Sequence, residues 1–226
     1  MLRFIQAAFF DVDGVLIDSL PQHLELCRDK AKEFQINLKV PSIDEFRAAV
    51  SAGVKVSPML DFFLAIGFPE EDANRAVATY DKEFATRYHP PAFEGVDSML
   101  RALRDQGARL GIVTSNTREN VTPVLAESLD AFDHSCLFFY DKEAPPRPKS
   151  SCLTEGARRL GLLPANCVYV GDQPADLRAA EAARCHFLGV TYGWGLLAGD
   201  SRFPAVGSVD EIPKKIVDID TKLVTR

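Results

Sequence analysis

Two acidic residues stand one residue apart at the end of a short apolar run near the start of the chain. The apolar run covers residues 7–10, and Asp11, Asp13 and Gly14 follow it. Such a run is typical of a buried parallel strand, and the glycine suits a tight turn that brings Asp13 back towards Asp11. An Asp-x-Asp-Gly sequence alone is more often a turn or part of a calcium loop. A calcium loop is disfavoured here, because no further acids follow at the required spacing and no glutamate closes it.

Polar residues with complementary chemistry follow three further apolar runs. They are Ser115 and Asn116 after residues 110–114, Arg147 and Lys149 after residues 136–140, and Asp172 and Asp176 after residues 167–170. In open parallel sheets, ligands bind at the carboxyl ends of the strands. Each stretch taken alone is more simply a helix cap or a solvated surface. The ordered set at four strand ends predicts one polar site.

The predicted site combines carboxylates with a hydroxyl, an amide and a cation. Three or more carboxylates in one cleft repel each other and raise one another's pKa unless a divalent cation neutralises them. Mg²⁺ fits this set best, because it prefers oxygen ligands and takes one or two carboxylates together with a substrate phosphate. The Ser115 hydroxyl, backbone amides and a lysine would hold the remaining phosphoryl oxygens. An aspartate can then attack phosphorus as a covalent nucleophile.

The pattern of the whole chain predicts an α/β fold. Strand-like apolar runs lie at residues 7–10, 110–114, 136–140, 167–170 and 187–191. Helical patterns lie at residues 94–106, 118–129 and 174–183. Alternation of strands and helices implies a parallel sheet with helices on both of its faces.

The segment between the first two predicted strands is helical by its pattern. A capping box is expected at Ser42, and Ser57–Pro58 predicts an N-cap followed by proline at the first helical position. A helical module of this size can bury a modest core of its own. We therefore expect a core that carries the sheet, residues 1–19 and 91–226, and an inserted helical cap domain, residues 20–90.

Composition and charge are those of an ordinary globular protein. The chain has 226 residues, of which 46% are hydrophobic and 26% charged, and its formal net charge is −6. The acidic balance argues against nucleic-acid or anionic-membrane partners, because such surfaces need clustered Lys and Arg. Five scattered cysteines without a CxxC pair predict reduced thiols and a cytoplasmic location. No segment approaches the roughly 20 apolar residues of a membrane-spanning helix.

Taken together, these residues resemble the haloacid dehalogenase superfamily of phosphohydrolases. The resemblance is carried by residues 11–19, residues 112–116, the basic residues Arg147 and Lys149, and residues 170–172 with Asp176. It spans nearly the whole chain and implies a Rossmann-like parallel sheet core. The helical insertion is similar to the cap of phosphoglycolate phosphatase-like and β-phosphoglucomutase-like members.

The resemblance implies a role for each acid. Asp11 would attack the phosphoryl group to form an aspartyl-phosphate and would also bind Mg²⁺. Asp13 would protonate the leaving oxygen and then activate water, while its backbone carbonyl binds the metal. Asp172 would be the other direct metal ligand. Asp176 would bind the metal either directly or through water.

The resemblance also implies residues that bind the phosphoryl group. Ser115 and Asn116 would hold its oxygens, and a basic residue would neutralise charge. The family's lysine usually stands in Lys-Pro-x-Pro, whereas here helix length points to Arg147 and the local sequence points to Lys149. We prefer Lys149, because a compact ammonium suits a crowded site better than a planar guanidinium. Lys55, in the loop between two cap helices, is a candidate for meeting an anionic substrate and equally an ordinary surface lysine.

The expected function is Mg²⁺-dependent hydrolysis of a small phosphorylated metabolite, phosphoglycolate-like or a sugar phosphate. Asp13 favours phosphoester cleavage over dehalogenation, because an alkoxide leaves badly unless it is protonated. A phosphomutase of the β-phosphoglucomutase type is the nearest alternative, and His23, placed where both classes carry a histidine, does not separate them. A non-catalytic binding module is the other alternative. The chain is expected to be a monomer or a homodimer.

Overall fold

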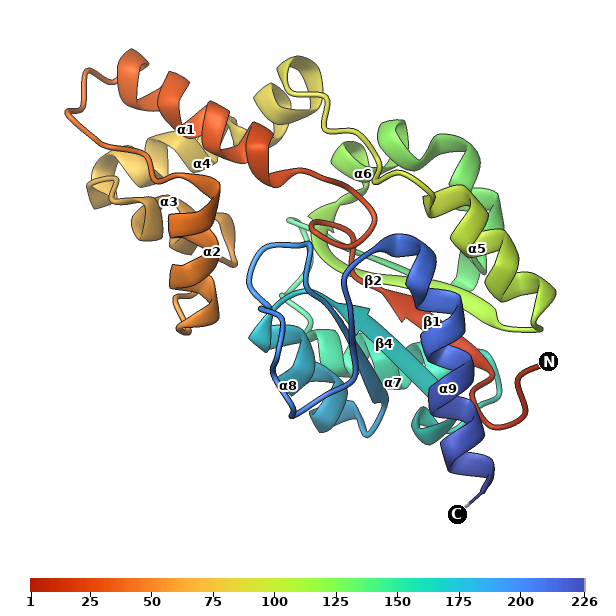
Figure 1. Cartoon of the computed structure of the whole chain (residues 1–226). Helices are drawn as coiled ribbons and strands as arrows, with labels where there is room; N and C mark the ends of the chain where they lie inside the picture. Colours follow the sequence, from red (N-terminus) through yellow and green to blue (C-terminus); the bar gives the residue numbers. More distant parts are fainter. Residues whose placement is uncertain (226) are drawn as a thin grey trace.

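The computed structural model describes residues 1–225, and these residues form a six-stranded parallel sheet covered by helices (Figure 1). The strands are β1 (Ala7–Phe10), β2 (Arg109–Thr117), β3 (Leu137–Tyr140), β4 (Cys167–Gly171), β5 (His186–Val190) and β6 (Ala205–Val206). Their order across the sheet is β3-β2-β1-β4-β5-β6, and each neighbouring pair is parallel. The predicted α/β fold with a parallel sheet is confirmed.

The register of the central strands determines where the polar loops meet. Phe10, the last residue of β1, pairs with Ile112 of β2 and with Val170 of β4. The loops after β1 and β4 therefore leave the sheet side by side, and β2 continues beyond this point to Thr117. All four residues of β1 are buried, which is why its sequence is a continuous apolar run rather than an alternating one.

Helices cover both faces of the sheet, as predicted. One face packs against α5 (Val96–Asp105), α6 (Arg118–Leu125) and α9 (Ile212–Val224), and Phe10 belongs to the hydrophobic cluster on that side. The other face packs against α7 (Lys149–Arg159) and α8 (Pro174–Ala183), and Phe9 belongs to its cluster. Successive residues of β1 thus fill opposite cores, as the twofold periodicity of a strand requires.

Of the five helices between β1 and β2, the first four stand apart from the sheet (Figure 1). They are α1 (Leu20–Glu33), α2 (Ile43–Ser51), α3 (Met59–Ile66) and α4 (Glu70–Arg87). Their apolar side chains form a separate hydrophobic cluster that includes Phe62, Phe63 and Phe84. Trp194, from the loop after β5, also belongs to this cluster. The division into residues 20–90 and the rest of the chain stays a prediction.

Helix starts agree with the sequence in one place and differ in another. Ser42 forms the predicted capping box with Glu45: its hydroxyl accepts a hydrogen bond from the Glu45 amide, and the Glu45 carboxylate accepts one from the Ser42 amide. The predicted cap at Ser57 is wrong. Pro58, with extended backbone angles, occupies the cap position, and α3 begins at Met59.

The carboxyl-terminal part of the chain contains elements that the sequence patterns did not predict. The short strand β6 extends the sheet, and α9 packs beside β1. Asp220 of α9 accepts hydrogen bonds from the backbone amides of Arg3, Phe4 and Ile5, which anchors the amino terminus. Within residues 1–225, no helix is both long enough and apolar enough to cross a bilayer. All five cysteines are unpaired thiols.

Candidate active site

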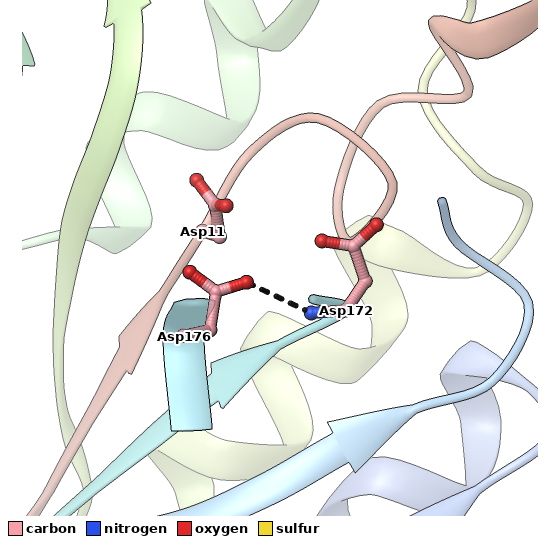
Figure 2. Close-up of side chains that lie close together, drawn as sticks. All are labelled: Asp11, Asp172 and Asp176. Carbon is pink, nitrogen blue, oxygen red and sulfur yellow. Dashed lines mark hydrogen bonds between the residues drawn. The ribbon is translucent and has the colours of Figure 1, made fainter. Parts of the chain in front are cut away.

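Three carboxylates from two neighbouring strand ends lie together at the edge of the sheet (Figure 2). Asp11 follows β1, Asp172 follows β4, and Asp176 lies in the first turn of α8. One oxygen from each lies within 4.8 Å of the others. The three residues are at most 3% exposed. The strand register thus brings acids 165 residues apart in sequence to within reach of one shared cation.

Burial makes this cluster electrostatically unfavourable by itself. Burial raises the pKa of Asp11 to about 6, although the neighbouring Lys149 ammonium lowers it. Burial also raises the pKa of Asp172 well above its ordinary value, and the charges of Asp176 and Asp11 raise it further. Crowded buried carboxylates are stabilised in their charged form by added positive charge. The cluster is therefore suited to binding a cation.

Asp172 has one satisfied oxygen and one that has no partner. Its Oδ2 accepts a hydrogen bond of 2.5 Å from the backbone amide of Trp194. Its Oδ1 is buried and has no hydrogen-bond partner among residues 1–225. Gly14, at φ +75°, lies so close that a Cβ there would overlap Asp172 Oδ2. A buried charged oxygen without a donor is costly, and the all-oxygen set fits a hard divalent cation as the missing partner.

Asp176, in contrast, is fully bonded by the protein. Its Oδ2 accepts hydrogen bonds from the backbone amides of Asp172 at 3.2 Å and Gln173 at 3.0 Å. Its Oδ1 accepts hydrogen bonds from the Lys149 ammonium at 2.8 Å and the Tyr169 hydroxyl at 3.2 Å. Asp176 thus holds the loop between β4 and α8 in place and has little capacity left for a direct metal bond.

The structure places Lys149, rather than Arg147, at the acids. Lys149 is the first residue of α7, and its Nζ donates hydrogen bonds to Asp11 Oδ2 at 2.6 Å and to Asp176 Oδ1 at 2.8 Å. Burial opposes the charge of Lys149, but the two carboxylates raise its pKa overall. Arg147 is exposed, and its guanidinium lies over the Phe138 ring, 5.7 Å from the centroid.

Asp13 lies apart from the three acids and has different partners. Its Oδ1 accepts a hydrogen bond from the Ser19 hydroxyl at 2.5 Å, and its Oδ2 accepts one from the Asn116 amide at 2.8 Å. His23 is buried beside this arrangement: Nδ1 lies 2.7 Å from the Ser19 carbonyl oxygen and Nε2 lies 2.8 Å from the Tyr80 hydroxyl. Burial lowers the pKa of His23.

Two residues proposed to bind substrate make no such contacts. Ser115 is exposed in β2, near its carboxyl end, and Lys55 is exposed in the loop between α2 and α3. None of the hydrogen bonds or ion pairs in the described chain joins Lys55 to an acid of the site. Thr114, which sequence reasoning passed over, is buried, and its hydroxyl accepts a hydrogen bond from the backbone amide of Asn116. The sequence does not distinguish which of the adjacent hydroxyls, that of Thr114 or that of Ser115, is buried.

The loop after β5 is a further part of the site that sequence reasoning missed. The backbone amides of Gly195 and Leu196 donate hydrogen bonds to the Asp172 carbonyl oxygen at 3.1 and 2.7 Å. Trp194 turns its ring away from Asp172 into the helical insertion, with its centroid 5.0 Å from that of His23 and 5.7 Å from that of Phe46. The signal in the sequence was a Gly-Trp-Gly stretch, residues 193–195, that is separated from β5 by two residues.

Comparisons with known proteins agree with this geometry. Residues 5–184 match the family model described as haloacid dehalogenase-like hydrolase. A phosphoglycolate phosphatase of Xanthomonas campestris pv. campestris is 32% identical over 203 residues, which cover 86% of this chain and 87% of the relative. A phosphoglycolate phosphatase of Salmonella typhimurium is 32% identical over 216 residues, which cover 85% of this chain and 84% of the relative.

A solved structure supports the fold. A predicted phosphoglycolate phosphatase from Haemophilus somnus 129PT superposes with a TM-score of 0.75 at 22% identity, covering 95% of this chain and 99% of that chain. The predicted fold class and the predicted enzyme class, a phosphoric monoester hydrolase, are confirmed by these similarities. The chain belongs to the haloacid dehalogenase-like hydrolase family.

Proposed function

We propose that the protein is a Mg²⁺-dependent phosphatase that hydrolyses a small phosphorylated metabolite through an aspartyl-phosphate on Asp11. The observation that carries this proposal is the buried cluster of Asp11, Asp172 and Asp176, with the Lys149 ammonium against Asp11. When bound, Mg²⁺ supplies positive charge to the carboxylates and to the phosphoryl oxygens. Asp11, the Asp172 side chain and the Asp13 backbone carbonyl would hold it directly. Asp176, already fully bonded, would act through water.

Two acids carry out the proposed reaction. The Asp11 carboxylate attacks phosphorus, the bond from phosphorus to the ester oxygen breaks, and Asp13 gives its proton to that leaving oxygen. Water then attacks the aspartyl-phosphate, Asp13 takes the proton from the water, and inorganic phosphate leaves with the Asp11 carboxylate restored. Asp13 suits this work because its carboxyl lies outside the cluster, where Ser19 and Asn116 orient it.

The surrounding residues would complete the site. Lys149 offsets charge on the nucleophile and on the phosphoryl group, and Ser115 and Asn116 hold phosphoryl oxygens. Residues 20–90 act as a cap that closes over the core and excludes water, with Lys55 meeting an anionic part of the substrate. The phosphoglycolate phosphatases among the relatives support a substrate of phosphoglycolate-like size. The free cysteines support a cytoplasmic setting.

The test is a measurement of phosphate release from phosphoglycolate and a panel of sugar phosphates, with Mg²⁺ or with EDTA. We expect phosphate release in the presence of Mg²⁺ and none in EDTA. Asp11→Asn should lower kcat roughly a thousandfold or more, because the nucleophile is removed. If no phosphoester released phosphate, the alternative of a non-catalytic binding module would be favoured instead. A hexose 1-phosphate that yields its 6-phosphate isomer rather than free phosphate would establish a phosphomutase.

A further inference from the structure

We propose that Asp81 and Asn120 are positioning residues for Asp13. By this proposal, the seating of helix α4 on the core orients the acid that protonates the leaving group. The inference rests on the proposed function, in which Asp13 is that acid. The observation behind it is a continuous line of hydrogen bonds that runs from Asp81 on α4 to Asp13 beyond β1.

The line has three hydrogen bonds and crosses four segments of the chain. Asn120, in α6, uses its side-chain amide nitrogen to donate to Asp81 Oδ1 at 3.3 Å and to Asn116 Oδ1 at 3.1 Å. The Asn116 amide nitrogen then donates to Asp13 Oδ2 at 2.8 Å. A residue of the insertion is in this way joined to an acid of the core through two buried or half-buried amides.

Hydrogen-bond chemistry allows only one orientation of these amides. The Asn116 NH₂ group donates to Asp13 Oδ2, so the side-chain oxygen of Asn116 is turned away from that acid. That oxygen also accepts a hydrogen bond from the Thr117 backbone amide at 2.8 Å, which holds it there. Asn120 then stands between two acceptors, Asn116 Oδ1 and Asp81, and must donate to both. The orientation of each side chain therefore depends on the next one along the line.

Burial makes the line more than an incidental surface contact. Asn120 is 6% exposed, and its own Oδ1 is buried with no partner in the part of the chain that the structure describes. Its side-chain amide nitrogen is thus the group that makes hydrogen bonds, and both of them lie in this line. Buried hydrogen bonds between polar groups hold their members in fixed geometry. Asn120 is accordingly placed to transmit the position of Asp81 to Asn116.

Asp81 is also the point at which α4 meets a second segment of the core. Its Oδ2 pairs with the Lys142 ammonium, in the loop after β3. Tyr80, the preceding residue of α4, contacts His23, whose other ring nitrogen lies beside the carbonyl oxygen of Ser19. Tyr80 and Asp81 thus connect α4 to the two residues that donate hydrogen bonds to Asp13, Ser19 and Asn116. Movement of α4 away from the core would break the line at its longest hydrogen bond, between Asp81 and Asn120.

The test uses two substrates that differ in their need for a proton. An alkyl phosphate such as phosphoglycolate expels an alkoxide that needs a proton from Asp13, whereas p-nitrophenyl phosphate expels a stable phenolate that does not. The later step, in which Asp13 takes a proton from water, is common to both esters and follows departure of the leaving group, so it does not enter kcat/KM. For Asp81→Ala and Asn120→Ala we expect kcat/KM for the alkyl ester to fall about tenfold, a fraction of what general acid catalysis contributes. With the aryl ester we expect a change of less than about twofold, since no proton is needed.

Three controls accompany these variants. Glu71→Ala removes an exposed acid of the same helix, and both substrates should be turned over as before. Lys142→Ala removes the ion pair and leaves the line intact, so the ratio of the two kcat/KM values should stay within about twofold of the unsubstituted chain. The double variant of Asp81 and Asn120 should lose no more than the larger single loss, because both residues act in one line.

The ratio of the two kcat/KM values decides the outcome. An equal fall with both substrates, or no fall with either, overturns the inference, because positioning of Asp13 would then not be what the variants change. If Asn120→Ala does not show a folded state in a thermal melt, Asp81→Ala, at a partly exposed position, gives the same ratio test alone. Absence of Mg²⁺-dependent turnover in the unsubstituted chain would overturn the proposed function instead.

Discussion

The charges of the site centre on one ammonium group that two carboxylates share. Lys149 Nζ lies 2.6 Å from Asp11 Oδ2 and 2.8 Å from Asp176 Oδ1. Removing one partner of a buried ion pair leaves the others uncompensated, which costs more than the pair contributes when intact. The effect of Lys149 on the proposed reaction should therefore be large, and Arg147, two residues earlier in the chain, offers the matched comparison.

We expect Lys149→Ala to lower kcat for phosphate release by about a hundredfold or more, because a charge that stabilises the phosphoryl transition state is lost. Arg147→Ala should change kcat by less than about twofold, since an exposed guanidinium over an aromatic ring stabilises little. Steady-state kinetics with the best phosphoester measure both. The opposite ranking of the two variants would place Arg147, not Lys149, at the phosphoryl group.

The raised pKa of Asp11 predicts how stability depends on pH in the metal-free protein. Burial raises this pKa from 3.8 to about 6, so the folded state binds more protons than the unfolded state between these values. Folding is therefore favoured at low pH, and this contribution, up to roughly 3 kcal/mol, is lost as the pH rises from about 4 to 6. Urea unfolding in EDTA should show that decline. Asp11→Asn should show a smaller one, and equal slopes would contradict the assignment.

The sequence predicted which acids meet but not how each is held. Asp11 and Asp172 follow apolar runs, and the carboxyl ends of neighbouring parallel strands must lie together. The donor to Asp172 Oδ2, the backbone amide of Trp194, belongs to an irregular loop. Its path depends on the tertiary packing of the indole ring rather than on local pattern. The same holds for Asn120, whose role in the line to Asp13 requires α4 and α6 to be in contact.

At the scale of elements, strands were easier to predict than helix ends. Strands β1 and β4 are buried on both faces and therefore appear as continuous apolar runs. The helix expected over residues 118–129 ends as α6 at Leu125 and continues as a 3-10 helix, Ala126–Ala131. The strand β6 has two residues, too few to show any periodicity. Where tertiary packing, rather than the pattern of apolar residues, determines the end of a helix or strand, the local sequence does not predict that end.

The turn after β1 provides a test at this scale. Gly14, at φ +75°, and Gly161, at φ +71°, share a left-handed backbone, but only at Gly14 would a Cβ overlap the Asp172 carboxylate. Both alanine variants should lose about 1 to 2 kcal/mol from the backbone conformation. Gly14→Ala should also displace Asp172 and lower Mg²⁺-dependent kcat by about tenfold or more, the scale of effect expected from misplacing a site by about an ångström.

The comparison with Gly161→Ala separates the two costs. Nothing lies within 4 Å of a Cβ at Gly161, so this variant should keep its kcat within about twofold while its melting temperature falls. Thermal melts and phosphate release measure both properties. Parallel losses of activity in the two variants would mean that backbone strain alone, and not contact with Asp172, accounts for the effect.

For the whole molecule, the helical insertion and the sheet meet at the loop after β5. Trp194 packs its ring against Phe46 and Phe62 of the insertion, while its backbone amide holds Asp172. A Cβ at Gly195 would overlap Val50 of α2, so the loop lies directly against that helix. The packing of the insertion and the position of a proposed metal ligand therefore depend on the same residue, through its ring and its backbone amide.

This coupling predicts that Trp194→Leu weakens Mg²⁺ binding as well as stability. Loss of ring volume in the buried cluster should cost about 1 to 3 kcal/mol. Freed from its packing, the loop should hold Asp172 less firmly, and calorimetry should show a rise of about tenfold in the dissociation constant for Mg²⁺, comparable to the loss of a supporting contact behind a metal ligand.

Phe63→Leu is the matched control for that change. Phe63 is fully buried in the same cluster, where its ring pairs are with Phe62, Phe68 and Tyr80 rather than with Trp194. A similar loss of stability with a Mg²⁺ dissociation constant within about twofold of the unsubstituted chain is expected, because no group bonded to Asp172 has moved. Equal weakening of Mg²⁺ binding in both variants would show that general loosening of the insertion, not the tryptophan loop, controls the metal site.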